Sequence, residues 1–372
     1  MLQQGYKPRP GAKLRKLAAS WQGKVPGVVR NQMKSRLKNW VKRVSQRTGV
    51  LRWASQFSPT GAAILMYHSV QDEPELYANS IGTGIIHATK MFARQMELVS
   101  TRFNPVTIND IELFLNGRKP LPPRAVAVTF DDGYLDNLEI VAPILNRFGV
   151  RAAFYLTAGI IGTKNPPWFC RLRNAFATAR NKEWLPPTNG KLWSLTTAQD
   201  RNAALLSAFD LCASLAGDSL EQSVQTIERD LDSEPLNDGC SLMMDWNQAR
   251  ALQRSGHIVG CHTLTHPNVA HVAQDVARKE LTESKRKLED ELGLPVPHFS
   301  YPHPALNPQW TTGTVAISKE AGYQTAVTTT PGLVCSGDSP LTLTRVWTPR
   351  SEHEFLWNLE RAFLRGRAQP VA

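Results

Sequence analysis

Two adjacent carboxylates and a pair of histidines have the residue types and the spacing of a metal-dependent hydrolase. Asp131 and Asp132 lie in the segment Thr-Phe-Asp-Asp-Gly at 129–133, directly after an apolar run typical of a buried strand. His262 and His266 follow a second such run and lie four residues apart, so both imidazoles are able to reach one ion. Each segment alone has an ordinary explanation, a solvated turn or a chance pair. Their joint occurrence predicts a catalytic site.

We expect Asp132, His262 and His266 to bind one divalent metal, with positions left for water and substrate, as in catalytic rather than structural sites. Zn2+ suits these nitrogen and oxygen ligands best, and Co2+, Ni2+ and Fe2+ stay open. A cation held in this way lowers the pKa of a water molecule and polarises a carbonyl oxygen. Asp131, beside it, is predicted to be the general base. The predicted reaction is the hydrolysis of an amide or an ester.

The candidate residues all lie just past the carboxyl ends of predicted strands. From Ala62 onward, short apolar runs alternate with stretches of helical periodicity, which favours a parallel α/β architecture. Strands are expected at 64–67, 125–130, 152–156, 257–261 and 298–301 and at 324–328. Helices are expected near 91–100, from 107, at 138–148, 245–256 and 272–291, before Gly322 and after Ser351. In α/β barrels the carboxyl-end rim carries the active site.

The net charge of +11 is concentrated at one end of the chain. Residues 1–60 hold 14 Lys or Arg and no acidic residue, whereas the remainder holds 29 basic and 32 acidic residues. Apolar residues from Met33 to Val44 recur at helical spacing among the basic ones, which predicts a cationic amphipathic helix. Such a helix is able to lie on an anionic membrane surface. A helix packed on the body, a disordered tail or a transit peptide stays open, and nucleic-acid binding is not expected because no stacking aromatic platform accompanies the charge.

We therefore divide the chain into a basic N-terminal extension at 1–60, a main domain at 61–350, and a C-terminal helix and tail at 351–372. The strand pattern disappears between about 165 and 240, which predicts an insertion there. No apolar run reaches the roughly 20 residues of a transmembrane helix, and the N-terminus lacks the pattern of a secretory signal. We expect a cytoplasmic protein or one that is peripheral at the inner membrane. Five widely spaced cysteines without a CxxC pair predict reduced, buried thiols.

The motifs together resemble those of the NodB-type polysaccharide deacetylases, metal-dependent enzymes that remove acetyl groups from N-acetylated sugars. The resemblance is carried by 129–133, by His-Thr-Leu-Thr-His at 262–266 and by Phe-Ser-Tyr-Pro at 299–302. Met-Tyr-His-Ser-Val at 66–70 resembles the opening of the branch that acts on exopolysaccharides. The resemblance covers about residues 62–350. It implies an irregular (β/α)7 barrel and, as substrate, the N-acetylated sugars of a surface polysaccharide. A lipid-linked oligosaccharide precursor at the inner leaflet is the alternative substrate, because it would agree with the missing export signal and with the basic extension.

The resemblance also implies roles for single residues. It makes Asp131 the general base and Asp132, His262 and His266 the metal ligands. It makes the segment Tyr301, Pro302 and His303 part of the substrate site, with the backbone around Pro302 and His303 in the oxyanion hole. His68 is expected to be the general acid that protonates the leaving amine, and the alternative for His68 is a strand-end histidine with a structural role.

The chain departs from the family pattern in its third motif and at its end. Many family members carry an Arg that orients the catalytic Asp at the position of Ser300, and Arg345, from a later strand, is the candidate replacement. The late Leu-x-His motif of the acid is missing, so this role falls on His68. His303 and Pro304 replace a Tyr and a Gly, which changes the sugar subsite.

Two other functions stay open on the sequence alone. In the first, the same metal site hydrolyses an O-acetyl ester or a small-molecule C–N bond. In the second, the protein is a carbohydrate-binding homologue without turnover. The paired carboxylates favour an enzyme, because Asp131 and Asp132 repel each other unless a cation compensates. The aromatic residues of the insertion either stack on sugar rings or form its small core, namely Trp168, Phe169, Trp184 and Trp193.

Overall fold

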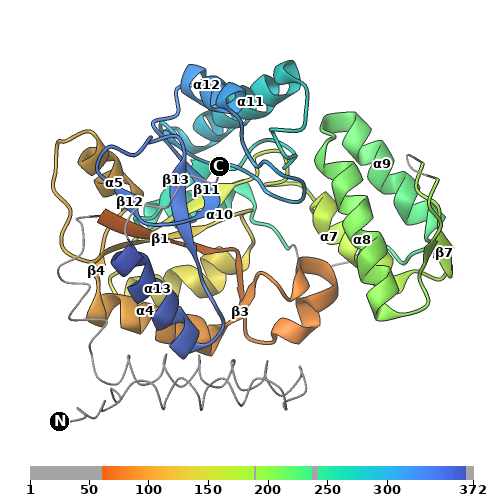
Figure 1. Cartoon of the computed structure of the whole chain (residues 1–372), viewed down its shortest axis with the longest axis horizontal. Helices are drawn as coiled ribbons and strands as arrows, with labels where there is room; N and C mark the ends of the chain where they lie inside the picture. Colours follow the sequence, from red (N-terminus) through yellow and green to blue (C-terminus); the bar gives the residue numbers. More distant parts are fainter. Residues whose placement is uncertain (1–60, 188–189, 237–241, 366–372) are drawn as a thin grey trace, which may run out of the picture. The chain divides into compact units, whose positions relative to one another are not determined.

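The structure is a computed structural model that describes residues 61–365 apart from 188–189 and 237–241 (Figure 1). The chain divides into two units between Trp53 and Ala54, and every described residue belongs to the second unit. The predicted basic extension, with its amphipathic helix, lies outside the described residues, so the expectations for it stay predictions. None of the helices in the described part of the chain is long and apolar enough to cross a bilayer.

Seven parallel strands close into a barrel, because β1 pairs with β5 on one side and with β13 on the other. In barrel order they are β1 (Gly61–Tyr67), β5 (Ala125–Phe130), β6 (Ala152–Leu156), β9 (Ile258–Cys261), β10 (His298–Ser300), β11 (Thr325–Pro331) and β13 (Leu343–Trp347). This arrangement confirms the predicted α/β fold and its (β/α)7 barrel. The strand pattern in the sequence identified six of the seven, and β13 is the later strand in which Arg345 was expected.

Short strands border the barrel. These are β4 (Asn104–Pro105) beside β5, β12 (Val334–Cys335) antiparallel to β1, the parallel pair β2 (Ser69–Gln71) and β3 (Ile86–Ala88), and the hairpin β7 (Glu183–Trp184) and β8 (Trp193–Ser194). β2 begins directly after His68, so its pairing with β3 fixes the chain that leaves the carboxyl end of β1.

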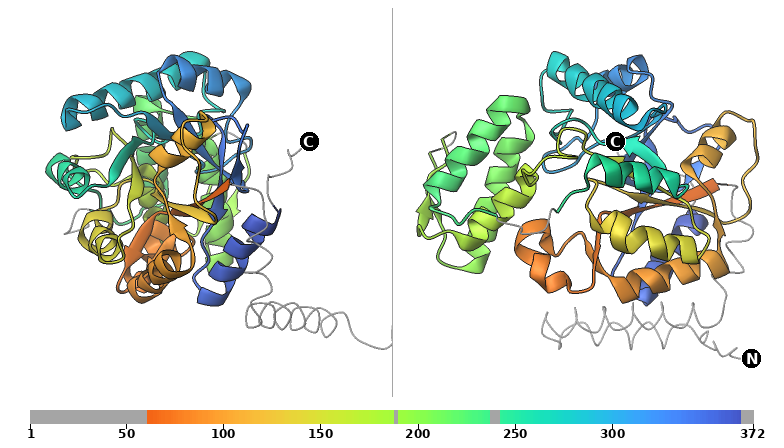
Figure 2. Two further views of the ribbon diagram at one scale, coloured as in Figure 1. Left: turned by 90° about the vertical axis from the view of Figure 1, so that its left-hand side faces the viewer. Right: turned by 180° about the vertical axis from the view of Figure 1, so that it is seen from behind.

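Helices surround the strands of the barrel (Figure 2). They are α4 (Thr89–Arg102), α5 (Ile108–Leu115), the π-helical turn η3 (Asn137–Val141) with α6 (Ala142–Arg147), α10 (Trp246–Arg254), α11 (Gln274–Leu292), α12 (Thr312–Glu320) and α13 (Glu352–Arg365), with η1 (Pro74–Tyr77) and η2 (Ala78–Gly82) after β2. Helices α5 and α10 start where the sequence predicted, and Thr107 and Asp245 form capping boxes at these starts. The helix predicted at 138–148 is divided, because its first turn is π-helical.

The barrel interior is filled by every second residue of its strands, because side chains alternate between the two faces of a strand. Small side chains such as Ala62, Ala127 and Ala153 leave room for Tyr155, which is fully buried among them. Their neighbours in sequence, such as Leu65 and Phe154, pack instead in the larger core between strands and helices. The barrel is therefore a packed core, and its chemistry is confined to the rim.

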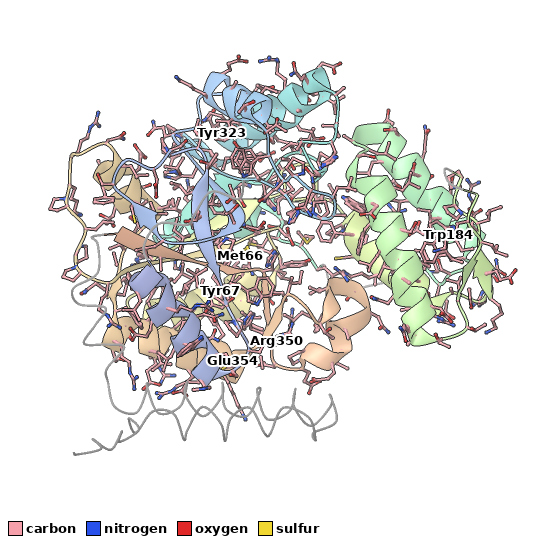
Figure 3. All side chains as sticks on the ribbon, in the orientation of Figure 1. Met66, Tyr67, Trp184, Tyr323, Arg350 and Glu354 are labelled. Atoms are coloured by element: carbon pink, nitrogen blue, oxygen red, sulfur yellow. The ribbon has the colours of Figure 1, made fainter. Side chains whose placement is uncertain are left out.

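The insertion consists of three helices and the hairpin β7–β8: α7 (Trp168–Thr178), α8 (Ala198–Ala213) and α9 (Gly217–Asp230). These helices lie together beside the barrel, as the green elements of Figure 1. They share a hydrophobic core that includes Trp168, Phe169 and Trp184, with Trp193 packed against it. Trp184 lies within the insertion in Figure 3, whereas Tyr323 lies near α11 and α12. The aromatic residues of the insertion therefore form its small core.

Gly260 of β9 is required by the way in which Tyr155 fills the barrel. A Cβ at Gly260 would lie 2.5 Å from a ring carbon of Tyr155 and 3.0 Å from the carbonyl oxygen of His298. We expect Gly260→Ala to lower the free energy of unfolding by about 2 kcal/mol, because the packed interior does not accept another methyl group. Chemical denaturation measures this change. Gly313→Ala in α12 is the control, since a Cβ there meets nothing closer than 3.4 Å; equal losses in both variants would contradict the packing argument.

Candidate functional site

The strand alternation that fills the barrel also carries four polar side chains to its carboxyl-end mouth. His68, Asp131 and His262 each continue the inward-facing positions of their strands, β1, β5 and β9. Arg345 occupies the inward face of β13, two residues after Leu343 of the interior cluster. All four are fully or largely covered by protein, and His68, Asp131 and His262 line one cavity.

Asp132 joins this group because its backbone leaves the regular strand conformation. Two successive residues of a strand point to opposite faces, but Asp132 has a φ of 78° that turns its side chain to the mouth as well. Thr263 and His266 also have positive φ values, both 65°. Non-glycine residues adopt this conformation only at a cost in free energy, and such strain concentrates at functional sites. Gly133, with a φ of 94°, completes the turn after the carboxylates.

Asp132, His262 and His266 form a buried group whose ligand atoms all lie within 4.8 Å of one another. Oδ1 of Asp132 lies 3.4 Å from Nε2 of His262 and 3.3 Å from Nε2 of His266. Ligands bound about 2.1 Å from a tetrahedral ion lie about 3.4 Å from one another, so these distances fit a shared cation. Oδ1 of Asp132 is buried without a hydrogen bond. The donor set and this unsatisfied oxygen fit a divalent metal.

Neighbouring groups orient the two imidazoles. Nδ1 of His262 lies 2.7 Å from the carbonyl oxygen of Ser300, which directs Nε2 toward Asp132. The loop between the histidines is held by Glu280 of α11, whose carboxylate accepts hydrogen bonds from the N–H groups of Leu264 and Thr265. The ring of His266 lies 4.7 Å from that of Phe169, measured between centres. The barrel, helix α11 and the insertion thus jointly position the ligands.

Arg345 holds Asp131 through both carboxylate oxygens. Nη1 and Nη2 of Arg345 lie 2.9 and 2.8 Å from Oδ1 and Oδ2 of Asp131, and both side chains are buried. Nε of Arg345 donates to the carbonyl oxygen of Thr328. Burial raises the pKa of Asp131, but the charge and hydrogen bond of Arg345 together with the nearby imidazoles of His262 and His68 outweigh burial and hold the pKa below the usual value. Asp131 is therefore an oriented carboxylate at neutral pH, and the Arg absent at Ser300 has a spatial replacement.

His68 lies at the mouth among the charged groups. Burial lowers its pKa below the usual value, although the charges of Asp132 and Asp131 oppose this effect. Asn137 donates a hydrogen bond to the His68 carbonyl oxygen. Asp136 accepts hydrogen bonds from the next residues, the Ser69 hydroxyl and the Val70 N–H among them, and burial raises its pKa to about 7. The segment after Asp131 and Asp132 thus also fixes the backbone of His68.

The third predicted segment contributes mainly its backbone. The Tyr301 hydroxyl lies 3.0 Å from Oγ of Ser318 in α12, so its ring points into the outer core. Pro302 has no N–H, and the N–H of Tyr301 donates a hydrogen bond to the carbonyl oxygen of Val327. The N–H of His303 donates to no residue within the described ranges. His303 itself is exposed and lines the cavity together with Tyr301.

The cavity over the metal-binding group has a volume of about 400 Å³. The lining residues that sequence reasoning missed include Arg173 and Phe209 from the insertion and Trp347 at the end of β13. Trp347 lies two residues after Arg345, so its place on the same strand face was the available signal. Arg173 and Phe209 carry no such signal, since only the packing of α7 and α8 brings them to the cavity.

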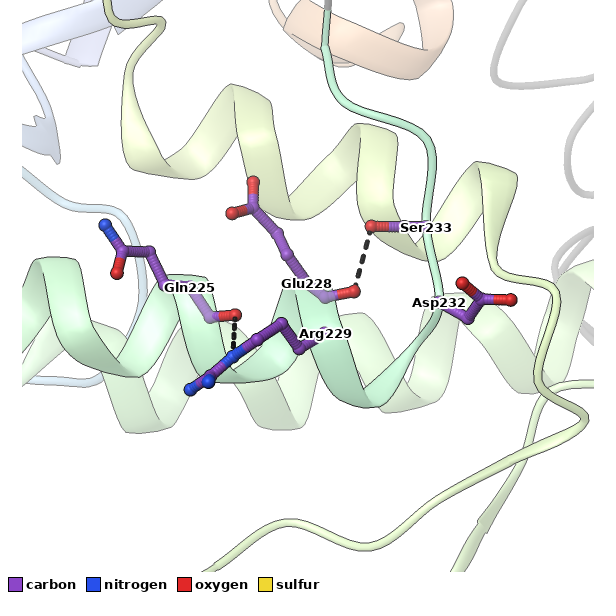
Figure 4. A pocket seen from close by; sticks show the side chains of 5 residues that line it. All are labelled: Gln225, Glu228, Arg229, Asp232 and Ser233. Atoms are coloured by element: carbon purple, nitrogen blue, oxygen red, sulfur yellow. Dashed lines mark hydrogen bonds between the residues drawn. The ribbon is translucent and has the colours of Figure 1, made fainter.

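A second hollow, of about 550 Å³, lies over the end of α9 (Figure 4). It is lined by Gln225, Glu228, Arg229, Asp232 and Ser233. Its polar groups are already bonded, as Arg229 is with the Gln225 carbonyl, Ser233 with the Glu228 carbonyl and the Glu228 carboxylate with Arg171 of α7. Among the described residues, its carboxylates belong to no group of three potential metal ligands. The chemistry of the described residues therefore belongs to the barrel mouth.

Four cysteines within the described ranges are buried, as predicted, and no disulfide joins any two of them, whereas Cys240 lies outside these ranges. Cys261 points away from the site, because its Sγ contacts Oγ of Ser284 in α11 at 3.0 Å while the neighbouring His262 faces the mouth. Cys261 is therefore part of the outer core and not a metal ligand.

Comparisons with known proteins agree with this geometry. The sequence model of a family described as polysaccharide deacetylase matches residues 118–326. The chain is 30% identical over 114 residues to the putative polysaccharide deacetylase YxkH of Bacillus subtilis, which is 30% of this chain and 38% of that protein. It is 34% identical over 89 residues to the poly-beta-1,6-N-acetyl-D-glucosamine N-deacetylase of Escherichia coli K12, 24% of this chain and 12% of that protein. The chain thus spans well under half the length of either relative.

Among solved structures, the Streptococcus pyogenes deacetylase PplD in complex with acetate is similar with a TM-score of 0.54. The match covers 82% of this chain and 99% of that one at 17% sequence identity. At this identity the likeness is one of fold, and it agrees with the seven-stranded barrel.

The buried pair of Arg345 and Asp131 provides a test of the site's internal electrostatics. We expect Arg345→Met and Asp131→Asn each to lower the free energy of unfolding by about 3 to 5 kcal/mol, because each leaves its partner buried without a counter-charge. The double variant should lose clearly less than the sum, since neither charge is then left alone. Urea denaturation measures all three.

Arg278→Met is the matched control, because Arg278 forms an exposed ion pair with Glu320. Its loss is expected to stay below about 1 kcal/mol. Additive losses in the Arg345 and Asp131 variants would contradict the coupling.

Proposed function

Because the chain belongs to the polysaccharide deacetylase family, we propose that it hydrolyses the N-acetyl group of a sugar in a surface polysaccharide or in its lipid-linked precursor. The observation that carries the proposal is the buried group of Asp132, His262 and His266, with Asp131 oriented beside it in the same cavity. The E. coli relative is named for N-deacetylation of poly-beta-1,6-N-acetyl-D-glucosamine, which supports an amide as the scissile bond.

The three ligands suit a divalent cation, and Zn2+ fits their nitrogen and oxygen atoms best. Such an ion supplies Lewis acidity, which polarises the acetyl carbonyl and lowers the pKa of a water molecule. Asp131 takes the proton of the attacking water as general base. Its hydrogen bond from Nη1 of Arg345 and its ion pair with Nη2 keep the carboxylate ionised and fixed in one orientation, so little reorganisation is needed when the proton moves.

His68 is proposed as the general acid for the leaving amine. An amide nitrogen leaves only after it has gained a proton, and His68 lies at the cavity close enough to Asp131, Asp132 and His262 to feel their charges. The free N–H of His303 is proposed to donate to the oxygen of the tetrahedral intermediate, since Pro302 has no N–H. The positions of the 66–71 and 301–303 segments at the cavity support the proposal of an acid and an oxyanion donor beside one metal-binding group.

Removal of the metal tests the proposal as a whole. We expect the purified protein to hold about one divalent ion per chain and to release acetate from N-acetylglucosamine oligomers. His262→Ala should lose the bound metal and at least about 100-fold of the acetate release together. Elemental analysis and an acetate assay measure both, with acetylated xylan as the ester comparison. Full acetate release by metal-stripped protein, or release from xylan only, would contradict N-deacetylation by this centre.

The acid role of His68 has a separate test. His68→Gln is expected to lower kcat on N-acetylglucosamine oligomers by about 10²- to 10⁴-fold and to leave the metal content unchanged. Turnover of 4-nitrophenyl acetate should change little, because nitrophenolate leaves without a proton. His271→Gln, outside the cavity, is the control. An equal loss on the amide and on the nitrophenyl ester would show that His68 does not act as the acid.

A further inference from the structure

Arg173, on α7 of the insertion, lines the cavity that contains the metal-binding group. Its guanidinium carbon lies 4.9 Å from the centre of the Phe209 ring, within the range of a cation–π interaction. Gly82 leaves room for the same guanidinium, since a Cβ there would lie 2.9 Å from its Cζ and Nη1 atoms. The aromatic ring and the bare backbone of Gly82 therefore fix the position of this charge in the cavity wall.

Arg173 has no hydrogen bond or ion pair with any residue that the structure describes, and its Nε is fully covered by protein. Other covered arginines are paired with carboxylates: Arg124 with Glu360, Arg345 with Asp131, and Arg171, two residues earlier on α7, with Glu221 and Glu228. Burial of the Nε–H group of Arg173 without an acceptor costs free energy. Its donors are thus available to a molecule that enters the cavity.

The carboxylates of the cavity are already engaged. Asp131 is neutralised by Arg345, and Asp132 belongs to the metal-binding group. With a divalent cation in that group, the cavity is electropositive, and Arg173 adds a further positive charge on the side of the insertion. An electropositive cavity with a fixed guanidinium favours a ligand that carries a negative charge.

We propose that Arg173 binds an oxyanion of the substrate, a carboxylate or a phosphate group, next to the sugar whose acetyl group is hydrolysed. This inference rests on the proposed function and specifies its substrate class as an N-acetylated saccharide that carries an acidic group. The planar guanidinium donates to two oxygens of such a group at once. An acidic sugar in the polymer and the phosphate of a lipid-linked precursor share this chemistry.

Equilibrium binding to the metal-loaded protein tests the inference without turnover. The ligands are cellotetraose, the oligoglucuronate of the same length, and glucose 1-phosphate, none of which carries an acetyl group. Calorimetry gives the Kd of each for the parent protein and for Arg173→Gln, Arg173→Lys and Arg180→Gln. Arg180 is an exposed arginine of the insertion that pairs with Glu234, so Arg180→Gln makes the same change of net charge outside the cavity.

We expect Arg173→Gln to weaken the binding of at least one acidic ligand about tenfold and to leave cellotetraose unchanged. Arg173→Lys should retain part of this affinity, and Arg180→Gln all of it. A loss confined to oligoglucuronate identifies a sugar carboxylate as the recognised group, and one confined to glucose 1-phosphate identifies a phosphate. Equal effects of Arg173→Gln on all three ligands, or none on either acidic ligand, would overturn the inference. Absence of acetate release by the parent protein overturns the proposed function instead.

Discussion

Two carboxylates in adjacent positions repel each other, and the mouth of this barrel is arranged around that repulsion. Asp131 is neutralised by a buried arginine, whereas Asp132 faces two imidazoles and retains an oxygen without a hydrogen bond. The two acids therefore receive different environments although they are neighbours in sequence. Asp131 is suited to proton transfer, and Asp132 is suited to binding a cation.

The backbone conformation at Asp132 and His266 follows from the same need to bring both carboxylates and both imidazoles to the barrel mouth. Regular strand geometry would have directed Asp131 and Asp132 to opposite faces, and the positive φ of Asp132 brings both to the mouth. His266 similarly needs a positive φ to return toward His262. Hydrogen bonds from the loop to Glu280 of α11 hold the chain in this conformation. The outer helices thus contribute to the chemistry by stabilising a strained loop at the rim.

The insertion adds a second layer to the site. Trp168 donates a hydrogen bond to the carbonyl oxygen of His266, and Phe169 packs on the ring of the same residue. The tryptophans serve the packing of the insertion and its attachment to the barrel. Phe209 and Arg173, which have no place in the barrel's motifs, form the wall that faces a substrate. The proposed catalytic residues therefore come from the barrel, whereas the residue proposed to select the substrate comes from the insertion.

The sequence by itself determined the repeating strands and helices, the ligand types, and the place of each candidate residue at a strand end. These features depend on local periodicity and on neighbours within a few residues. Closure of the barrel was decided only by the tertiary structure, because it requires β1 to meet β13, with paired residues such as Leu65 and Val346 lying 281 positions apart in the chain. The pairing of Asp131 with Arg345, the approach of Arg173 to the cavity and the left-handed turn at Asp132 depend on that closure and on long-range packing. Periodicity within one segment contains no information about such contacts between segments.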